Sequence, residues 1–448
     1  MCHFRFMKLL ERLGLHRPEL RAWAIYDWAN SAFWTTIVAA VFPIYFARVA
    51  AADLPPAVAT TRFAAATTFA MVLVALLSPV LGALADFAGL KMKMLGAFLA
   101  LGVTATGAMV FIGRGDWELA LLLFVLGNIG VTGSLVFYES LLPHIASEEE
   151  RDMVASAGFA LGYLGGGLLL AVNLLAIQKP GLFGIADEMT ASRLSFLSVA
   201  LWWLGFSIPL FRRVKEPERR LEKDESGREN ALRVAFSRLG ETFRELKHYR
   251  DAFLMLAAFL IYNDGILTII RMATSYGTEV GLDQSVLISA LLITQVVGIP
   301  FAFLFGWLAK HITAKRAILL ALAVYAGISI VGYRMESAFD FYVLAILVGT
   351  VQGGAQALSR SLFSTLIPVH KSAEFFAFFG VFDKFAGIFG PALFAITIAA
   401  TGSSRNAVLS VIAFFVLGAI LLSLVNVEEG RRVAREAEAK LEPRSHRD

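Results

Sequence analysis

Apolar segments long enough to cross a membrane recur twelve times along the chain, separated by short polar turns. An α-helix needs roughly 20 residues to span the hydrocarbon core of a bilayer. In the first half these segments cover residues 22–46, 63–84, 94–113, 119–142, 154–177 and 194–211. In the second half they cover residues 252–270, 286–309, 317–333, 341–367, 375–400 and 407–425. The pattern predicts an all-α integral membrane protein with about twelve transmembrane helices.

Three polar segments flank or separate the two groups of six spans. The N-terminal one mixes apolar and basic residues and predicts a short amphipathic helix at the membrane surface. The middle one places Leu232, Phe236 and Leu239 on one stripe, which predicts a second such helix. The last is charged on all faces and is expected to be a helix that frays into a tail. The expected parts are an N-terminus (1–21), a six-helix bundle (22–211), a linker (212–250), a second bundle (251–427) and a tail (428–448).

Composition and charge agree with a membrane protein. The chain is 57% hydrophobic and 17% charged, which is too apolar for a soluble domain, and its net charge is +4. The basic residues gather in the turns on one side, so the charge indicates membrane orientation rather than nucleic-acid binding. We expect both termini in the cytoplasm and the protein in the cell (inner) membrane. The first apolar run is too long for a cleavable signal.

The sequence offers no chemistry typical of an enzyme. The single cysteine, Cys2, excludes an intramolecular disulfide framework, and the histidines lack the spacing of metal ligands. No nucleophile–base pair and no phosphate-binding glycine loop is recognisable. We therefore expect no metal and no cofactor, and as partners a lipid bilayer and a small solute, with a proton as the candidate coupling ion. We expect a monomer.

The chain repeats a short motif at matching places in its two halves. Gly82, Asp86, Gly89, Lys91 and Lys93 follow the second span in the pattern G-x-x-x-D-x-x-G-x-K-x-K. After the eighth span the pattern starts again at a glycine, with lysine at the aspartate position and threonine at the second glycine position. Two pseudo-symmetric six-helix bundles are expected from this repeat. An aspartate at a helix end can bind the N-terminus of another helix through that helix's dipole.

Polar residues inside the spans are the candidates for solute or proton binding, because charges in a bilayer are costly to retain. Each of them could instead hold helices together. Asn263, Asp264 and Gly265 favour a break in the seventh span, and we expect Asp264 to be the coupling carboxylate with Arg360 near it. Glycines 158, 162 and 166, and glycines 387 and 390, are interpreted as packing positions. The candidates are Asp27, Asn30, Glu139, Asn263, Asp264, Gln356, Arg360, Asp383 and Lys384.

The first span carries a resemblance to a known family. Its residues 26–33, Tyr-Asp-Trp-Ala-Asn-Ser-Ala-Phe, and 41–46, Val-Phe-Pro-Ile-Tyr-Phe, resemble the opening helix of the autophagy-related vacuolar amino-acid effluxers and their bacterial relatives. These proteins belong to the major facilitator superfamily. The resemblance implies two six-helix bundles that rock about a central site, with amino acids or similar small zwitterionic solutes as substrates.

The same resemblance implies a role for the motif after the second span. In the superfamily its aspartate meets the eleventh span, which here begins near Phe375, only while the cytoplasmic side is closed. We therefore expect Asp86 to act as a conformational latch, with a symmetric latch at Lys310 doubtful. The alternative function is a membrane receptor or scaffold that keeps the fold without moving solute. It would be favoured by a permanent Asp264–Arg360 pair and the lack of a cavity.

Overall fold

The computed structural model describes residues 10–218, 248–279, 282, 284–387 and 389–440, and these form helices and connecting turns. The first half contains α2 (Pro18–Ala32), α3 (Val41–Tyr45), α4 (Pro56–Ala88), α5 (Lys91–Ala108), α6 (Trp117–Ile145), α7 (Arg151–Gln178) and α8 (Glu188–Arg213). The second half contains α10 (Arg250–Glu279), α11 (Gln284–Ile312), α12 (Ala314–Tyr333), α13 (Ala338–Thr365), α14 (Ser372–Phe385), α15 (Phe389–Thr401), α16 (Ser404–Ser410) and α17 (Ile412–Leu424). The last helix is α18 (Val427–Ala439).

Twelve spans can be followed through these helices. Eleven stretches of the described chain are long and apolar enough to cross a membrane, the first of them running as one distorted helix from Pro18 to Ala50. The remaining span is the eleventh, which is divided into α14 and α15. The predicted all-α membrane fold is confirmed.

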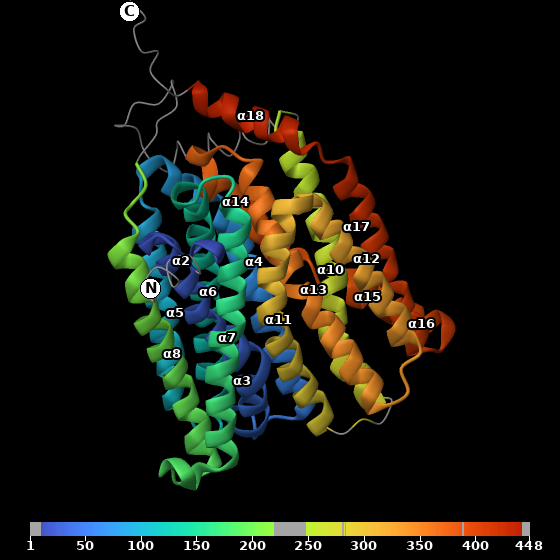
Figure 1. The fold of residues 1–448 in the computed structure, drawn as a ribbon. Helices are drawn as coiled ribbons and strands as arrows, with labels where there is room; N and C mark the ends of the chain where they lie inside the picture. Colours follow the sequence, from blue (N-terminus) through green and yellow to red (C-terminus); the bar gives the residue numbers. More distant parts are fainter. Residues whose placement is uncertain (1–9, 219–247, 280–281, 283, 388, 441–448) are drawn as a thin grey trace, which may run out of the picture.

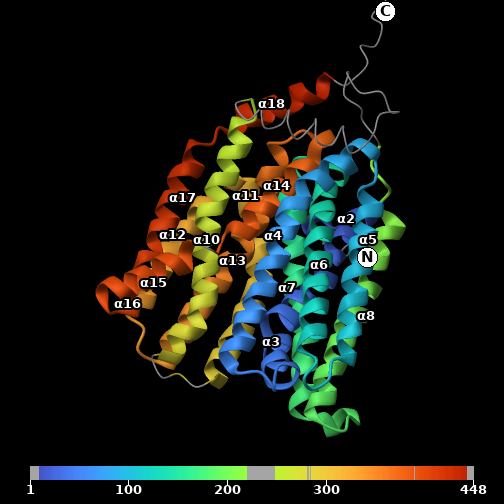
Figure 2. The ribbon, with the colours of Figure 1, turned by 180° about the vertical axis from the view of Figure 1, so that it is seen from behind.

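The helices form two bundles with separate cores (Figures 1 and 2). One apolar core is built almost wholly from residues before Val214, and the other almost wholly from residues after Tyr249. The bundles meet where α4 packs against α14 and where α7 packs against α11. The proposed domain boundaries stay predictions, and most of the linker, including its predicted amphipathic stripe, lies outside the described residues.

The final helix lies across one end of both bundles (Figure 1), which we call the α18 end. Arg431 forms an ion pair of 2.7 Å with Glu148 of the first half. Glu438 accepts a hydrogen bond of 2.7 Å from the backbone of Val369 in the second half. The prediction that this segment is charged on all faces is wrong, because Val433 and Ala434 form a buried side.

The predicted break in the seventh span is wrong, because α10 runs without interruption through residues 263–265. Gly265 serves close packing, since a Cβ there would lie 2.9 Å from side-chain atoms of Phe414 and Phe415. The break lies instead in the eleventh span, where Gly387 has a φ of 90° between α14 and α15. Glycine adopts this conformation without steric cost.

Glycines allow helices to approach closely at three places. Gly82 of α4 faces the backbone of Ala373 in α14, and Gly306 of α11 faces Ser156 in α7. These two glycines start the two copies of the repeated motif, so the repeat places equivalent contacts between the bundles. The stripe of Gly158, Gly162 and Gly166 packs against the first span, which confirms the interpretation of this stripe as a packing surface.

The two copies of the motif also share a turn with positive φ. Gly89 has a φ of 63° and Thr313 a φ of 77°. Among the described residues, Thr313 is the one residue other than glycine that has a positive φ. Thr313 combines this φ with a ψ of 150°. This backbone conformation is adopted almost only by glycine, and it costs another residue about 1–3 kcal/mol of strain.

We expect Thr313→Gly to raise the free energy of unfolding by about 1 kcal/mol, because the relief of strain exceeds the roughly 0.5–1 kcal/mol entropic cost of a glycine. Thermal unfolding in detergent measures the change. Thr313→Ala is the matched control, since it keeps the Cβ that causes the strain. Equal melting temperatures for the glycine variant and the parent would contradict the prediction.

Candidate substrate pathway and its closure

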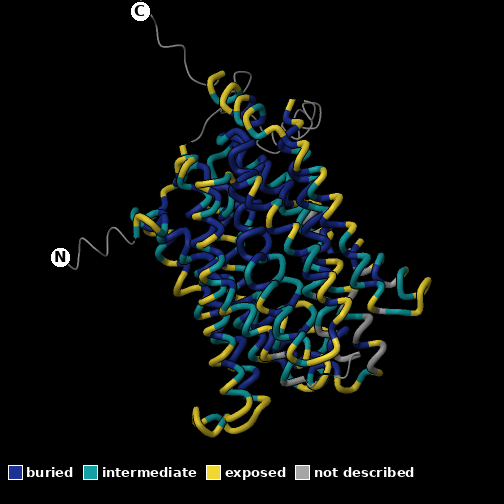
Figure 3. Tube along the Cα trace, turned by 45° about the vertical axis from the view of Figure 1, so that its right-hand side comes forward, coloured by how far each residue is buried: buried dark blue, intermediate teal, exposed yellow. Residues whose placement is uncertain are grey.

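A cavity of about 900 Å³ lies between the two bundles. Its inner residues include Thr35, Thr268 and Gln352, near the middle of their helices. Its outer residues include Arg48 and Glu188, at helix ends opposite to the α18 end. Along the trace, buried residues predominate toward the α18 end and intermediate exposure becomes more frequent toward the other end (Figure 3). The cavity therefore reaches from the far end to the middle of the protein, and the α18 end is closed.

Three predicted site residues meet beneath this cavity and join the two bundles. Arg360 of α13 lies 3.2 Å from a carboxylate oxygen of Asp27 and 3.5 Å from one of Glu139. Arg360 is 5% exposed and Asp27 is 6% exposed. Arg360 lies two helical turns beyond Gln352 of the cavity, about 12 Å at the rise of an α-helix. These ion pairs lie on the path that a solute would take to the α18 end.

Aromatic side chains of the first half surround the Arg360 guanidinium. Its central carbon lies 4.6 Å from the ring centre of Phe159 and 5.4 Å from that of Trp23. Trp23 stacks on Tyr138 with a separation of 4.5 Å and donates a hydrogen bond to the Tyr138 carbonyl. A guanidinium over aromatic faces gains cation–π attraction, which is larger away from water. Arg360 of the second bundle is thus held among aromatic and acidic side chains of the first bundle.

The other predicted residues near this cluster have supporting positions. Asn30 donates hydrogen bonds to the Tyr26 carbonyl at 2.7 Å and to Asp27 at 3.4 Å. Gln356 is half-buried and lies one turn from Arg360 on α13.

Asp264 lies elsewhere, in the second bundle, where it caps α15. Its two carboxylate oxygens accept hydrogen bonds from the backbone N–H groups of Phe389 at 2.9 Å and Gly390 at 2.7 Å. A carboxylate at a helix N-terminus satisfies free N–H groups and interacts favourably with the helix dipole. The expectation that Arg360 lies beside Asp264 is wrong, since Arg360 forms ion pairs with Asp27 and Glu139 of the first bundle.

The neighbouring residues of α10 and α14 complete this second group. Asn263 donates a hydrogen bond of 3.0 Å to Asp383, so α10 holds both sides of the break in the eleventh span. Thr268 donates to the Asp264 carbonyl at 2.7 Å and also lines the cavity. The side chain of Lys384 lies outside what the structure describes.

The motif after the second span closes the α18 end. Asp86 accepts a hydrogen bond of 2.8 Å from the backbone N–H of Glu374, in the first turn of α14. It also forms an ion pair of 2.7 Å with Lys91. Gly89 forms the turn between them, and Lys93 is exposed. The contact between Asp86 and the eleventh span is present as expected, while its role as a latch stays a prediction.

A further polar contact across the bundles lies nearby. Arg151 of α7 donates a hydrogen bond of 2.7 Å to the carbonyl of Ser364 in α13.

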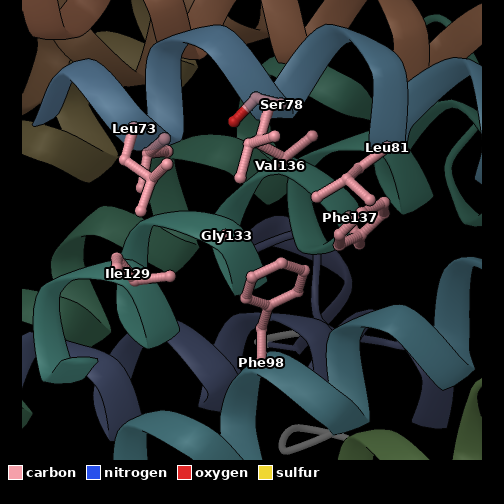
Figure 4. A pocket seen from close by; sticks show the side chains of 10 residues that line it. Leu73, Ser78, Leu81, Phe98, Ile129, Gly133, Val136 and Phe137 are labelled. Carbon is pink, nitrogen blue, oxygen red and sulfur yellow. The ribbon is translucent and has the colours of Figure 1, made fainter. Parts of the chain in front are cut away.

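A second cavity lies within the first half, between α4, α5 and α6 (Figure 4). Its volume is about 20 Å³, and Phe98, Val136 and Phe137 are among its mainly apolar lining residues. A space of this size holds about one water molecule. It is too small for a solute, so it is a local packing gap between these helices.

Sequence reasoning missed several of these features. The break in the eleventh span had a signal in Gly387 and Gly390, which were interpreted as packing positions. The aromatic residues around Arg360 had none, because their role depends on a partner in the other bundle. The buried side of α18 was hidden by the charges around Val433 and Ala434.

Comparison with known proteins places these observations in a family. Residues 57–435 match the protein family described as "Vacuole effluxer Atg22 like". The MFS-type transporter YxiO of Bacillus subtilis (strain 168) is 38% identical over 417 residues, which are 93% of this chain and 96% of that protein. Autophagy-related protein 22-1 of Aspergillus niger is 27% identical over 315 residues. The match spans 66% of this chain and 50% of that fungal protein.

Solved structures agree on the fold. The proton:xylose symporter XylE superposes with a TM-score of 0.70 over 95% of this chain and 98% of its own, at 14% identity. A bacterial homologue of the iron transporter ferroportin, in an outward-facing state, superposes with a TM-score of 0.62 over 91% of this chain and 98% of its own, also at 14% identity. These likenesses show the major facilitator fold alone.

Proposed function

Because the chain belongs to the family of vacuole effluxer Atg22-like proteins, which are major facilitator transporters, we propose that it moves amino acids or similar small zwitterionic solutes by alternating access. One observation carries the proposal. A cavity of about 900 Å³ is accessible from one end, and ion pairs between the bundles close the other end. Opening of the α18 end would separate Arg360 from Asp27 and Glu139 and connect the cavity to the opposite side.

The cavity lining supports a solute with both charged and apolar parts. Arg48 and Glu188, which carry opposite charges, both line its outer part. Hydroxyl and amide groups of Thr35, Thr268 and Gln352 lie among apolar side chains at its inner end. Pockets of this kind use a few polar groups to orient a ligand and apolar walls to bind it.

The scaffold alternative loses its main support. It required a locked Asp264–Arg360 pair without a cavity, whereas Arg360 pairs with the other bundle and a large cavity is present. Uptake of labelled amino acids into proteoliposomes, with and without a pH gradient, tests the proposed function. Saturable uptake of at least one amino acid supports it, and equal counts with protein-free liposomes would overturn it.

We further propose that the α18 end faces the cytoplasm, so that both termini are cytoplasmic. The basic residues of the turns at this end support this orientation. Single cysteines at Ser226 and Ser404, introduced after replacement of Cys2, can be labelled in intact cells with an impermeant reagent. We expect labelling at position 404 only. Labelling of position 226 from outside would reverse the orientation.

Asp264 is the carboxylate that we propose for proton coupling. A proton would compete for it with the N–H groups of Phe389 and Gly390, so protonation would be linked to the position of α15. Asp264→Asn keeps one acceptor and cannot release a proton. We expect it to fold with a loss of about 1–2 kcal/mol, to exchange solute, and to lose pH-driven accumulation.

Counterflow and pH-driven uptake in proteoliposomes separate these effects. Asp383→Asn is measured in parallel, because it changes the neighbouring candidate carboxylate, which accepts a hydrogen bond from Asn263, without touching the cap of α15. Accumulation by Asp264→Asn that equals the parent's would make Asp264 structural and move the search to Asp27, Glu139 and Asp383.

A further inference from the structure

A histidine, His144, lies among the contacts of Asp86 and Lys91 with α14 that close the α18 end; we call these contacts the closure. The ammonium of Lys91 is 2.7 Å from Asp86, 2.8 Å from the hydroxyl of Ser372 and 2.7 Å from the Nε2 atom of His144. His144 Nε2 is also 3.1 Å from the Ser372 hydroxyl. These four side chains come from α4, α5, α6 and α14, and Ser372 belongs to the bundle opposite to the others.

The contact between Lys91 and His144 defines the protonation state of the imidazole. An ammonium donates three hydrogen bonds and accepts none. Lys91 is charged in this pair because it faces the Asp86 carboxylate, 4% exposed. Its hydrogen-bond partners are the Ser372 hydroxyl and His144 Nε2, and the Asp86 carboxylate is its ion-pair partner. The 2.7 Å contact is therefore a hydrogen bond only if Nε2 carries no proton, that is, if His144 is neutral.

Protonation of His144 would change this contact from attraction to repulsion. Two cations would then lie within hydrogen-bond distance in a place with little water to screen them. Lys91 would be displaced from Ser372. The ion pair that positions Asp86 next to the N-terminus of α14 would then be weakened. Histidine is the side chain whose ordinary pKa lets its charge change between pH 5 and 8.

We propose that His144 is the positioning residue of the closure and makes it sensitive to pH: neutral His144 holds Lys91 in place, and its protonation opens the α18 end. The inference rests on the proposed transport cycle and orientation. A proton that binds better to the open than to the closed state shifts the population toward the open state. Acidification at the α18 end thus releases the closure.

Among the described residues, the other ionisable groups at this junction include Asp86 on α4, Lys91 on α5, Glu216 after α8, and His370, Lys371 and Glu374 around the start of α14. Arg17 and Arg151 also lie close, since they donate hydrogen bonds to the carbonyls of Ile145 and Pro143 on either side of His144. Glu216 accepts a hydrogen bond of 2.9 Å from the backbone of Met92. Burial raises the pKa of the Glu216 carboxyl, although the Met92 amide and the Lys91 charge oppose the rise. Glu216 is therefore the alternative sensor that the experiment has to separate.

Distances between spin labels test the proposal in the full-length protein without solute. Cysteines replace the exposed residues Arg213 and Arg316, one in each half near the α18 end, in a chain without Cys2. We expect the ratio of open to closed states to rise by at least about threefold between pH 8 and pH 5.5. A single linked proton sets an upper bound of about tenfold per pH unit.

Two variants identify the residue responsible. His144→Gln supplies a neutral acceptor for Lys91 at every pH, so we expect it to stay closed and lose the pH response. Glu216→Gln should keep the response of the parent. A pH response in His144→Gln equal to that of the parent, or a parent that does not respond, would overturn the proposal.

Asp86→Asn provides the reference for a protein that is open at the α18 end. It should populate the open state more than the parent at both pH values, and an unchanged distribution would remove the latch on which the proposal depends. Because these distances are measured without solute, failed amino-acid uptake would overturn the proposed substrate and leave this result intact.

Discussion

Arg360→Ala is expected to move the protein almost completely to conformations that are open at the α18 end. The change removes the guanidinium that pairs with the carboxylates of Asp27 and Glu139 in a nearly dry site. Removal of one member of a buried ion pair costs about 3–5 kcal/mol. Opening of the α18 end hydrates both carboxylates, so the protein can avoid this cost by changing conformation. The same energy corresponds to a population shift of roughly 150-fold to 4,000-fold.

The spin-label pair at positions 213 and 316 measures this shift, and proteoliposome uptake measures its effect on transport. We expect loss of accumulation together with a dominant open population. Arg360→Lys is the matched control, because lysine keeps the charge and loses the planar guanidinium that reaches two carboxylates. It should give an intermediate population. Parent-like distances in Arg360→Ala would show that these ion pairs do not hold the closed state.

Gly82→Ala is expected to have the second largest effect, because it separates the bundles by steric contact alone. A Cβ at this position would lie 2.5 Å from the carbonyl oxygen of Ala373 and 2.8 Å from its carbonyl carbon. These are backbone atoms of α14 and cannot rotate away. Overpacking of a fitted contact costs about 1–3 kcal/mol. Asp86 lies one helical turn from Gly82, so the same displacement weakens its contact with α14.

The same distance measurement gives the open population of Gly82→Ala, which should rise by at least about fivefold, as a cost of 1 kcal/mol implies. Gly205→Ala is the matched control, since a Cβ there meets nothing within 4 Å. Gly306→Ala should have a smaller effect, because its nearest neighbours are the Oγ and Cβ atoms of Ser156 rather than main-chain atoms, and the hydroxyl can rotate away. An equal response of Gly82→Ala and Gly205→Ala would show that the α4–α14 contact does not control closure.

The sequence was sufficient to predict the spans, the two bundles and the position of Asp86. Length and hydropathy define a membrane helix, and the repeated motif places its aspartate at a helix end. The partner of Arg360 could not be predicted in this way. Asp27 lies 333 positions away in the chain and in the other bundle, and helical periodicity describes only the face on which a side chain lies.

Local propensity failed at Asn263, Asp264 and Gly265 for a related reason. These residues favour turns, yet two of them bind partners on α14 and α15, and the third packs against α17. Tertiary contacts therefore keep α10 helical. The interrupted helix is instead the eleventh span, at Gly387. The polar residues that seemed to break one helix support the interruption of another.

The turns at Gly89 and Thr313 bear on the history of the two halves. If both halves descend from one duplicated gene segment, an ancestral glycine would explain why a β-branched residue now occupies a positive φ of 77°. The positive φ was then kept while the side-chain chemistry changed, since the aspartate of the first copy corresponds to Lys310 in the second. On that assumption, the matching positions now carry opposite charges, Asp86 in the first copy and Lys310 in the second. Divergence of this kind makes the two halves unequal, so that one conformation, closed at the α18 end by the Asp86 contact, is favoured over the other.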